Sequence, residues 1–203
     1  MPKLSAQARA RKIKLLLFDV DGVLTDGKLY FLPLEESAAA PPTTASATKN
    51  SSSMIEFKGF HAHDGLAASL ARVAGLQMGL ITRRSSEIVA GRARDLKLEF
   101  VCQGVVDKRA AFQSIVEKAG LEPGEAAFVG DDIVDVPAMR AGGLAVAVKN
   151  ARAEVKREAH YVTPHAGGDG ALRDAVEFIL KAQGKWKRVV ESCIGETGPK
   201  DSR

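Results

Sequence analysis

With 203 residues and a hydrophobic content of 45%, the chain is long enough for one domain with a substantial core and too short for two ordinary domains. The formal net charge is +4, and a basic segment ahead of the first acidic residue supplies it through Lys3, Arg9, Arg11, Lys12 and Lys14. Because that segment contains the whole excess and no basic patch with interleaved aromatic residues follows it, the charge does not favour a nucleic-acid-binding protein.

Two cysteines, Cys102 and Cys193, lie far apart and outside any cluster of metal-ligating residues. They therefore argue against a zinc site or a disulfide framework and are typical of a reducing compartment. The first apolar run, at 13–18, is too short for a signal peptide or a membrane span. We expect a cytoplasmic protein with no membrane or nucleic-acid partner, folded as a single domain over 1–203, with 1–12 as a basic tail and 184–203 as a C-terminal tail.

In chain order, short apolar segments alternate with segments of helical character. Strands are expected at 14–18, 78–81, 99–102, 126–129 and 144–148, and helices at 64–74, 85–96, 108–119, 135–141 and 170–183. Gly75 and Gly120 follow helical segments and suit the left-handed residue that ends a helix. Strands separated by helices predict an α/β fold, a doubly wound, Rossmann-like parallel sheet that helices cover on both faces.

One segment departs from this alternation. Residues 33–53 are rich in Pro, Ser, Thr and Ala, a composition that cannot bury enough apolar surface to offset its ordering entropy. The flanking residues 28–32 and 54–58 both have strand character, so the sequence predicts a small β-hairpin flap over 28–58. We interpret 33–53 as a flexible surface insertion at its tip, rather than as a functional loop.

Polar residues follow the predicted strands at the points where they end. Asp19 and Asp21 follow the first strand, Thr82 the second, Lys108 the third and Asp131 the fourth. Ligands of open α/β sheets bind beyond the carboxyl ends of the strands, so we expect these side chains to converge. Carboxylates beside a hydroxyl and an ammonium group form an oxygen-lined site for Mg²⁺ with donors for a phosphoryl group. Since Mg²⁺ takes only one or two carboxylates, one of the first two aspartates stays free for covalent chemistry.

The segment DVDGVLTDG, then Thr82, Lys108 and the segment GDDIVD, in this order, resemble the haloacid dehalogenase superfamily of aspartate-nucleophile phosphatases. The resemblance implies that Asp19 attacks phosphorus to give an aspartyl phosphate and that Asp21 acts first as general acid and then as general base. It also implies that Thr82, Lys108 and Gly22 bind the phosphate.

The same resemblance implies where the metal lies. Asp19, the backbone carbonyl of Asp21 and Asp131 would bind Mg²⁺, and Asp132 or Asp135 would support these ligands. Physical chemistry agrees, because a cation beside Asp19 keeps that carboxylate ionised.

Each of these residues also has a structural alternative. Asp19 and Asp21 would then only end a strand, Asp107 or Asp132 would cap a helix, and Lys108 would be a solvated lysine in a first helical turn. Their conjunction in one order favours the functional interpretation.

Further segments, including FHAHDGLAASL and FVGDDIVDVPAMRAGGLAVAVKNA, closely resemble the 3-deoxy-D-manno-octulosonate 8-phosphate phosphatase family. The resemblance implies a capless enzyme that releases phosphate from a sugar-acid phosphate. It also implies a homotetramer in which hairpins meet and the tail with Lys185, Lys187 and Arg188 reaches a neighbouring site. His63, Asp64, Gly65 and Arg83 would contact the substrate.

Three positions depart from that family's pattern. Where the family usually has Arg-Asp-Gly, this chain has His63 in place of the arginine. Where the family usually has Thr-Gly-Arg, this chain has Arg83 in place of the glycine, and His165 stands where an arginine often precedes Ala-Gly-Gly. A guanidinium binds carboxylate or phosphate with two parallel hydrogen bonds and an imidazole does not. A nine-carbon, sialic-acid-type sugar-acid 9-phosphate is therefore the alternative substrate.

Two other classes of protein share part of this pattern. A response-regulator receiver domain also surrounds Mg²⁺ with acidic residues, Thr and Lys, but it lacks Asp-x-Asp after its first strand. A non-catalytic regulatory relative is disfavoured because all four motifs are intact.

Overall fold

The computed structural model describes residues 4–33 and 54–195. Six parallel strands form the central sheet in the order β5-β4-β1-β6-β7-β8. Their bounds are β1 Leu15–Phe18, β4 Gln77–Ile81, β5 Phe100–Cys102, β6 Ala126–Gly130, β7 Leu144–Ala147 and β8 Tyr161–Val162. The predicted parallel sheet is confirmed, and β1 lies inside it between β4 and β6.

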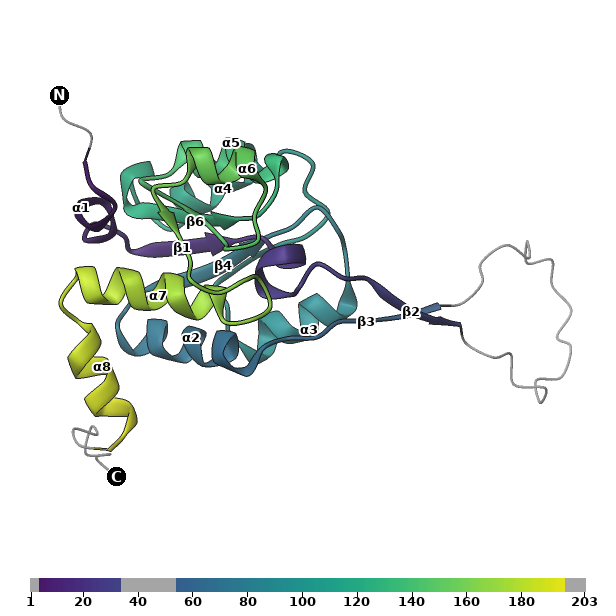
Figure 1. Cartoon of the computed structure of the whole chain (residues 1–203), viewed down its shortest axis with the longest axis horizontal. Helices are drawn as coiled ribbons and strands as arrows, with labels where there is room; N and C mark the ends of the chain where they lie inside the picture. Colours follow the sequence, from purple (N-terminus) through teal and green to yellow (C-terminus); the bar gives the residue numbers. More distant parts are fainter. Residues whose placement is uncertain (1–3, 34–53, 196–203) are drawn as a thin grey trace, which may run out of the picture.

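Helices cover both faces of the sheet, as Figure 1 shows, with α4, α5 and α6 on one face and α2, α3 and α7 on the other. The helices are α1 Ala6–Ala10, α2 Ala62–Val73, α3 Glu87–Asp95, α4 Lys108–Lys118, α5 Val136–Ala141, α6 Ala153–Glu158, α7 Ala171–Ala182 and α8 Trp186–Cys193. All four side chains of β1 are buried, because helices cover the strand on both sides. None of the helices in the described ranges combines the length and the apolar character that a bilayer span requires.

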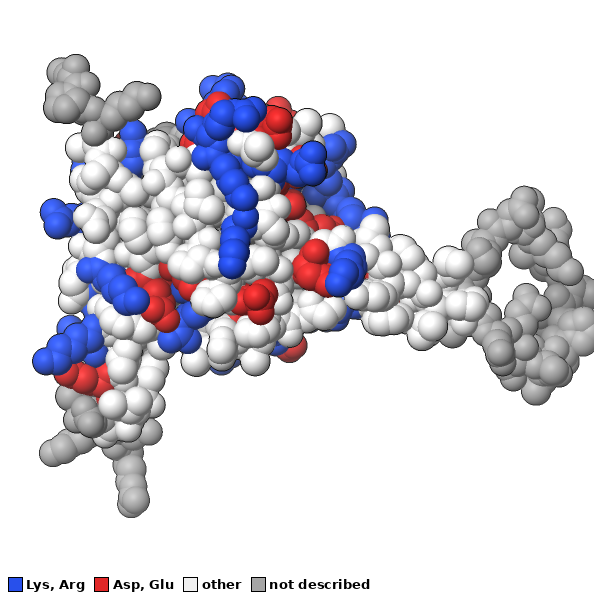
Figure 2. All heavy atoms as spheres, viewed as in Figure 1, with Lys and Arg blue, Asp and Glu red and all other residues white. Residues whose placement is uncertain are grey.

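The predicted hairpin is present. Strands β2 (Tyr30–Pro33) and β3 (Met54–Phe57) pair antiparallel and project from the body of the protein (Figure 1). Both strands expose large apolar side chains, and Figure 2 shows a projecting stem almost without charged groups. The insertion predicted at 33–53 lies outside the described residues, apart from Pro33, which ends β2. The described part of the chain contains no cap domain.

Both predicted tails contain helices that the sequence did not reveal. Helix α1 begins after Ser5, whose hydroxyl accepts a hydrogen bond from the backbone N–H of Ala8 at 3.2 Å, and it packs against α7. Helix α8 also packs against α7, and its Trp186 ring lies 5.3 Å from both the Arg173 guanidinium and the Lys181 ammonium group. The first part of the predicted tail 184–203 therefore contains a packed helix, which aromatic and cationic contacts hold in place.

Candidate active site

Asp19 leaves the carboxyl end of β1 and enters a tight helical turn, η1 (Val20–Leu24). Its Oδ1 accepts a hydrogen bond from the backbone N–H of Val20 at 2.7 Å. Gly22, in the same turn, has φ +90°, and a Cβ added there would lie 2.2 Å from Oδ2 of Asp131. Only glycine allows the η1 backbone to come so close to that carboxylate.

A buried lysine joins two aspartates at the centre of the site. Nζ of Lys108 lies 2.7 Å from Oδ2 of Asp19 and 2.7 Å from Oδ1 of Asp135, and the lysine side chain is 1% exposed. Lys108 is therefore not the solvated first-turn lysine of the structural alternative, although it does begin α4. The second oxygen of Asp135 accepts the backbone N–H groups of Asp131 at 3.0 Å and Asp132 at 3.2 Å. Asp135 thus holds both the lysine and the loop that carries Asp131.

Three carboxylates meet here with one lysine to balance them. Asp19, Asp131 and Asp135 each offer one oxygen, and the three oxygens lie within 4.8 Å of one another. Burial and the nearby Asp135 raise the pKa of Asp19 to about 6, although Lys108 opposes the shift. Burial together with Asp135 and Asp19 raises the pKa of Asp131 to about 7. Such crowded carboxylates fit a divalent cation. Asp135 is less available than Asp19 as a ligand, because it accepts from Lys108 and two amides, whereas Asp19 accepts from Lys108 and one amide.

Thr82 and the two candidate capping residues have clear positions. Thr82 is buried at the end of β4, where its backbone N–H donates to the Cys102 carbonyl at 2.9 Å. Asp107 accepts from the backbone N–H of Ala110 at 3.0 Å, and Asp132 accepts from that of Ile133 at 2.7 Å. Both aspartates therefore cap helical turns, as the structural alternative for them predicted.

Asp64, which the resemblance places among the substrate contacts, makes two hydrogen bonds to the backbone at the start of α7. Its side chain is fully buried, and its two oxygens accept the backbone N–H groups of Gly170 at 3.1 Å and Arg173 at 3.0 Å. Burial raises the pKa of Asp64 while these amides oppose the shift. Both carboxylate oxygens of Asp64 thus cap the start of α7.

The other residues expected to contact the substrate, His63, Gly65 and Arg83, have different surroundings. His63 and His165 line one small cavity of about 220 Å³ beside the start of α7. The His165 ring contacts Asp174, with Nδ1 2.9 Å from Oδ2. A Cβ on Gly65 would lie 2.6 Å from Nη2 of Arg92, so this glycine accommodates a side chain of α3. Arg83 is exposed after β4.

Lys58, Glu56 and Arg84 are functional candidates that the sequence reasoning missed. Lys58 forms an ion pair with Oδ1 of Asp21, and Nε of Arg84 lies 3.7 Å from Oδ2 of the same residue. Glu56 lies between the two cations, 3.4 Å from Lys58 Nζ and 2.9 Å from Arg84 Nη2. The available signal was the spacing of Glu56 and Lys58, two residues apart at the end of a strand and therefore on one face.

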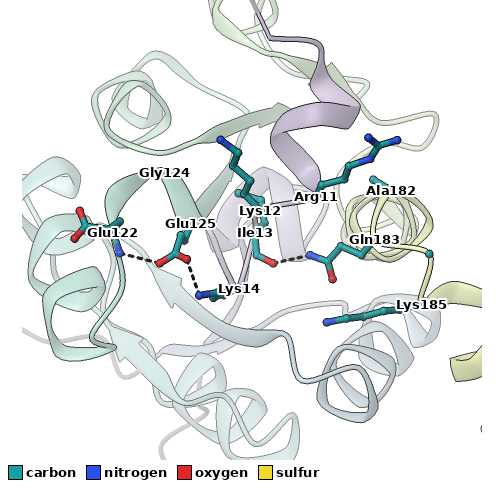
Figure 3. Close-up of a pocket in the computed structure, with 11 residues that line it drawn as sticks. Arg11, Lys12, Ile13, Lys14, Glu122, Gly124, Glu125, Ala182, Gln183 and Lys185 are labelled. Carbon is teal, nitrogen blue, oxygen red and sulfur yellow. Dashed lines mark hydrogen bonds and ion pairs between the residues drawn. The ribbon is translucent and has the colours of Figure 1, made fainter.

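A separate groove of about 880 Å³ lies at the amino ends of β1 and β6, the opposite edge of the sheet from these aspartates (Figure 3). Lys14 pairs there with Glu125 at 2.6 Å, and Gln183 donates to the Ile13 carbonyl at 2.6 Å. The groove therefore belongs to the packing of α7 against the start of β1, away from the candidate active site.

Comparison with known proteins identifies the class. The family model of haloacid dehalogenase-like hydrolases matches residues 82–173, which include Thr82, Lys108 and the Asp131 loop. The chain is 36% identical to 3-deoxy-D-manno-octulosonate 8-phosphate phosphatase of Escherichia coli over 178 residues, covering 88% of this chain and 85% of that protein.

Two solved structures support the match. The phosphatase of the same name from Yersinia pestis is 32% identical with a TM-score of 0.76, covering 90% of this chain and 88% of that one. The Moraxella catarrhalis phosphatase, solved in complex with a magnesium ion, a phosphate ion and a KDO molecule, is 31% identical with a TM-score of 0.79 and covers 93% and 97%. The chain therefore belongs to the capless 3-deoxy-D-manno-octulosonate 8-phosphate phosphatase family of the haloacid dehalogenase superfamily, and it is a phosphoric monoester hydrolase.

Proposed function

We propose that the protein hydrolyses 3-deoxy-D-manno-octulosonate 8-phosphate to the free sugar acid and inorganic phosphate, as a step of lipopolysaccharide biosynthesis. The observation that carries the proposal is the buried cluster in which Lys108 contacts both Asp19 and Asp135 while Asp131 lies beside them. Relatives named 3-deoxy-D-manno-octulosonate 8-phosphate phosphatase match most of the chain and support this choice of substrate.

In the proposed reaction, a carboxylate oxygen of Asp19 forms a bond to phosphorus as the bond from phosphorus to the sugar oxygen breaks. Asp21 gives its proton to the departing sugar oxygen. A water molecule then attacks the aspartyl phosphate, Asp21 takes a proton from that water, and the bond between Asp19 and phosphorus breaks. Lys108, 2.7 Å from Asp19, helps to keep the attacking carboxylate ionised, and with Thr82 and Gly22 it binds the phosphate.

Mg²⁺ is the cofactor that fits the oxygen-only donor set of Asp19, Asp131 and the Asp21 backbone carbonyl. Asp135 holds the loop beside it through the backbone N–H groups of Asp131 and Asp132, and the side chain of Asp132 caps the turn that follows. When bound, it neutralises charge on the reacting phosphoryl oxygens. The magnesium ion in the Moraxella catarrhalis relative and the cobalt in the Haemophilus influenzae relative support this assignment.

We also propose that the chain, a single domain over 1–203, works as a homotetramer through its hairpin. The stem exposes between 39% and 56% of the side chains of Tyr30, Phe31, Leu32, Met54, Ile55 and Phe57. An uncharged surface of this kind is rare on a monomer. In the tail that is proposed to reach a neighbouring site, Lys185 donates to the Ala74 carbonyl at 3.0 Å and Lys187 lies 3.7 Å from Glu191, both within this chain, and residues 196–203 lie outside the described ranges. The cytoplasmic location stays a prediction.

A phosphate-release screen tests the function. Purified protein with Mg²⁺ is given phosphorylated eight-carbon and nine-carbon sugar acids and ordinary hexose phosphates. We expect the eight-carbon substrate to give the highest kcat/KM and Asp19→Asn to abolish release. Preference for the nine-carbon acid, or equal rates on all substrates, would overturn the substrate assignment, and an active Asp19→Asn variant would overturn the mechanism.

A further inference from the structure

The carboxylate of Asp21 belongs to a closed ring of four charged side chains. Around the ring, Asp21 contacts Lys58, Lys58 contacts Glu56, Glu56 contacts Arg84, and Arg84 returns to the other oxygen of Asp21. Negative and positive groups alternate, so every neighbour in the ring carries the opposite charge. Each oxygen of Asp21 thus faces its own cation, which restricts rotation of the carboxylate.

The ring joins three separate parts of the fold. Asp21 lies in η1 after β1, Arg84 follows β4, and Glu56 and Lys58 belong to β3 and its end. Glu56 is itself anchored, because its second oxygen accepts the Ser86 hydroxyl at 2.6 Å. Burial raises the pKa of Glu56, but the Ser86 hydroxyl, Lys58 and Arg84 together lower it by more, so that the pKa of Glu56 lies below its ordinary value. Glu56 therefore stays ionised and continues to pair with both cations.

Lys58 is the most enclosed member of this ring. Its side chain is 1% exposed, compared with 23% for Asp21 and 42% for Arg84. An ammonium group so shielded from water needs oppositely charged partners, and Lys58 has two carboxylates. The geometry assigns to this hairpin lysine a task at the reacting centre, in addition to any role that the hairpin has in assembly.

We infer that Lys58, with Arg84 and Glu56, is a positioning residue that orients the Asp21 carboxyl group toward the leaving oxygen of the substrate. The inference rests on the proposed function, in which Asp21 transfers its proton to that oxygen as the bond to phosphorus breaks. Lys58 contacts Asp21 directly, so the effect inferred for it passes through the general acid.

The leaving group supplies the test. A sugar alcohol must be protonated as it departs, whereas p-nitrophenolate leaves as a stable anion. General acid catalysis contributes about 10²- to 10⁴-fold, so poor positioning of Asp21 in Lys58→Met should lower kcat/KM for the sugar-acid phosphate and for glycerol 3-phosphate by about 10- to 100-fold. The value for p-nitrophenyl phosphate should change by less than about threefold, since that substrate needs little acid catalysis.

Matched variants separate the possible outcomes. Lys58→Arg should restore most of the lost activity and Arg84→Met should reproduce the leaving-group pattern. Lys28→Met is the matched control, because Lys28 is an exposed lysine at the start of the hairpin and lies 3.1 Å from Asp26. It should leave kcat/KM unchanged on every substrate. Asp21→Asn should show the same dependence on the leaving group as Lys58→Met.

Three results would overturn the inference: an equal fall on all substrates in Lys58→Met, no fall on any, or a fall confined to the sugar-acid phosphate, which indicates a direct substrate contact. The proposed function fails separately, if Asp19→Asn remains active or if Asp21→Asn shows no dependence on the leaving group.

Discussion

Replacing Lys108 with Met should strongly destabilise the metal-free protein. The substitution removes the cation that lies 2.7 Å from both Asp19 and Asp135, whose side chains are 10% and 0% exposed. Breaking a buried pair and leaving its charge uncompensated costs about 3–5 kcal/mol. We expect a loss of this size in the free energy of unfolding, measured by urea denaturation followed by circular dichroism at pH 7.5 with EDTA.

The control for this experiment is Lys14→Met. Lys14 also forms an ion pair, 2.6 Å from Glu125, but its side chain is 60% exposed and that of its partner 26%. Exposed ion pairs contribute roughly 0–1 kcal/mol, so the control should lose less than about 1 kcal/mol. Adding Asp135→Asn to Lys108→Met should recover part of the loss, because it removes one of the two uncompensated charges. Equal losses in Lys108→Met and Lys14→Met would refute the reasoning.

Three other predictions follow from the same geometry. Burial raises the pKa of Asp19 to about 6 and of Asp131 to about 7, so between about pH 4 and about pH 7 these two carboxyl groups bind more protons in the folded metal-free protein than in the unfolded chain. The melting temperature of the metal-free protein should therefore fall more steeply than that of an Asp131→Asn variant as the pH rises from about 4 to about 7. A melting temperature that rose relative to the variant would contradict the raised pKa of Asp131. Gly22→Ala should lower the free energy of unfolding by about 1–2 kcal/mol, because Gly22 has φ +90°. The same variant should weaken Mg²⁺ binding measured by calorimetry, because the new Cβ would lie 2.2 Å from Oδ2 of Asp131, and an unchanged Mg²⁺ affinity would count against a metal site there. Asp64→Ala should lower the free energy of unfolding by about 1–3 kcal/mol, since two backbone N–H groups at the start of α7 lose their acceptor, and it should leave kcat/KM of the folded enzyme unchanged. A fall in kcat/KM without a loss of stability would instead support the expected substrate contact.

The sheet could be predicted from sequence because its strands are short apolar runs between helices of ordinary length. The two residues of β8 and the six of α6 carry too little periodicity to stand out. Helices α1 and α8 are stable through contacts with α7, which a local pattern does not contain. Propensity alone therefore describes the core of this fold better than its ends.

The site divides in the same way. Asp19, Lys108 and Asp131 follow strands, and neighbouring parallel strands end at one edge, so their convergence could be predicted from order along the chain. The position of Asp64 could not, because its partner Gly170 lies 106 residues away and the cap forms only when α2 packs against α7. Lys58 was missed for a similar reason: a hairpin has no fixed position relative to a sheet until its stem packs.

The place of β1 in the sheet also affects how the protein is made. β1 is synthesised first among the sheet strands, yet it lies between β4 and β6, and β6 emerges from the ribosome only after more than half of the chain. Until then the apolar residues Leu15–Phe18 have no complete set of partners, which exposes the nascent chain to aggregation. Since Asp131 also follows β6, no incomplete chain that ends before that strand carries both Asp19 and Asp131, the two proposed metal ligands. Catalytic competence therefore appears late in translation, when most of the domain is ready to fold around it.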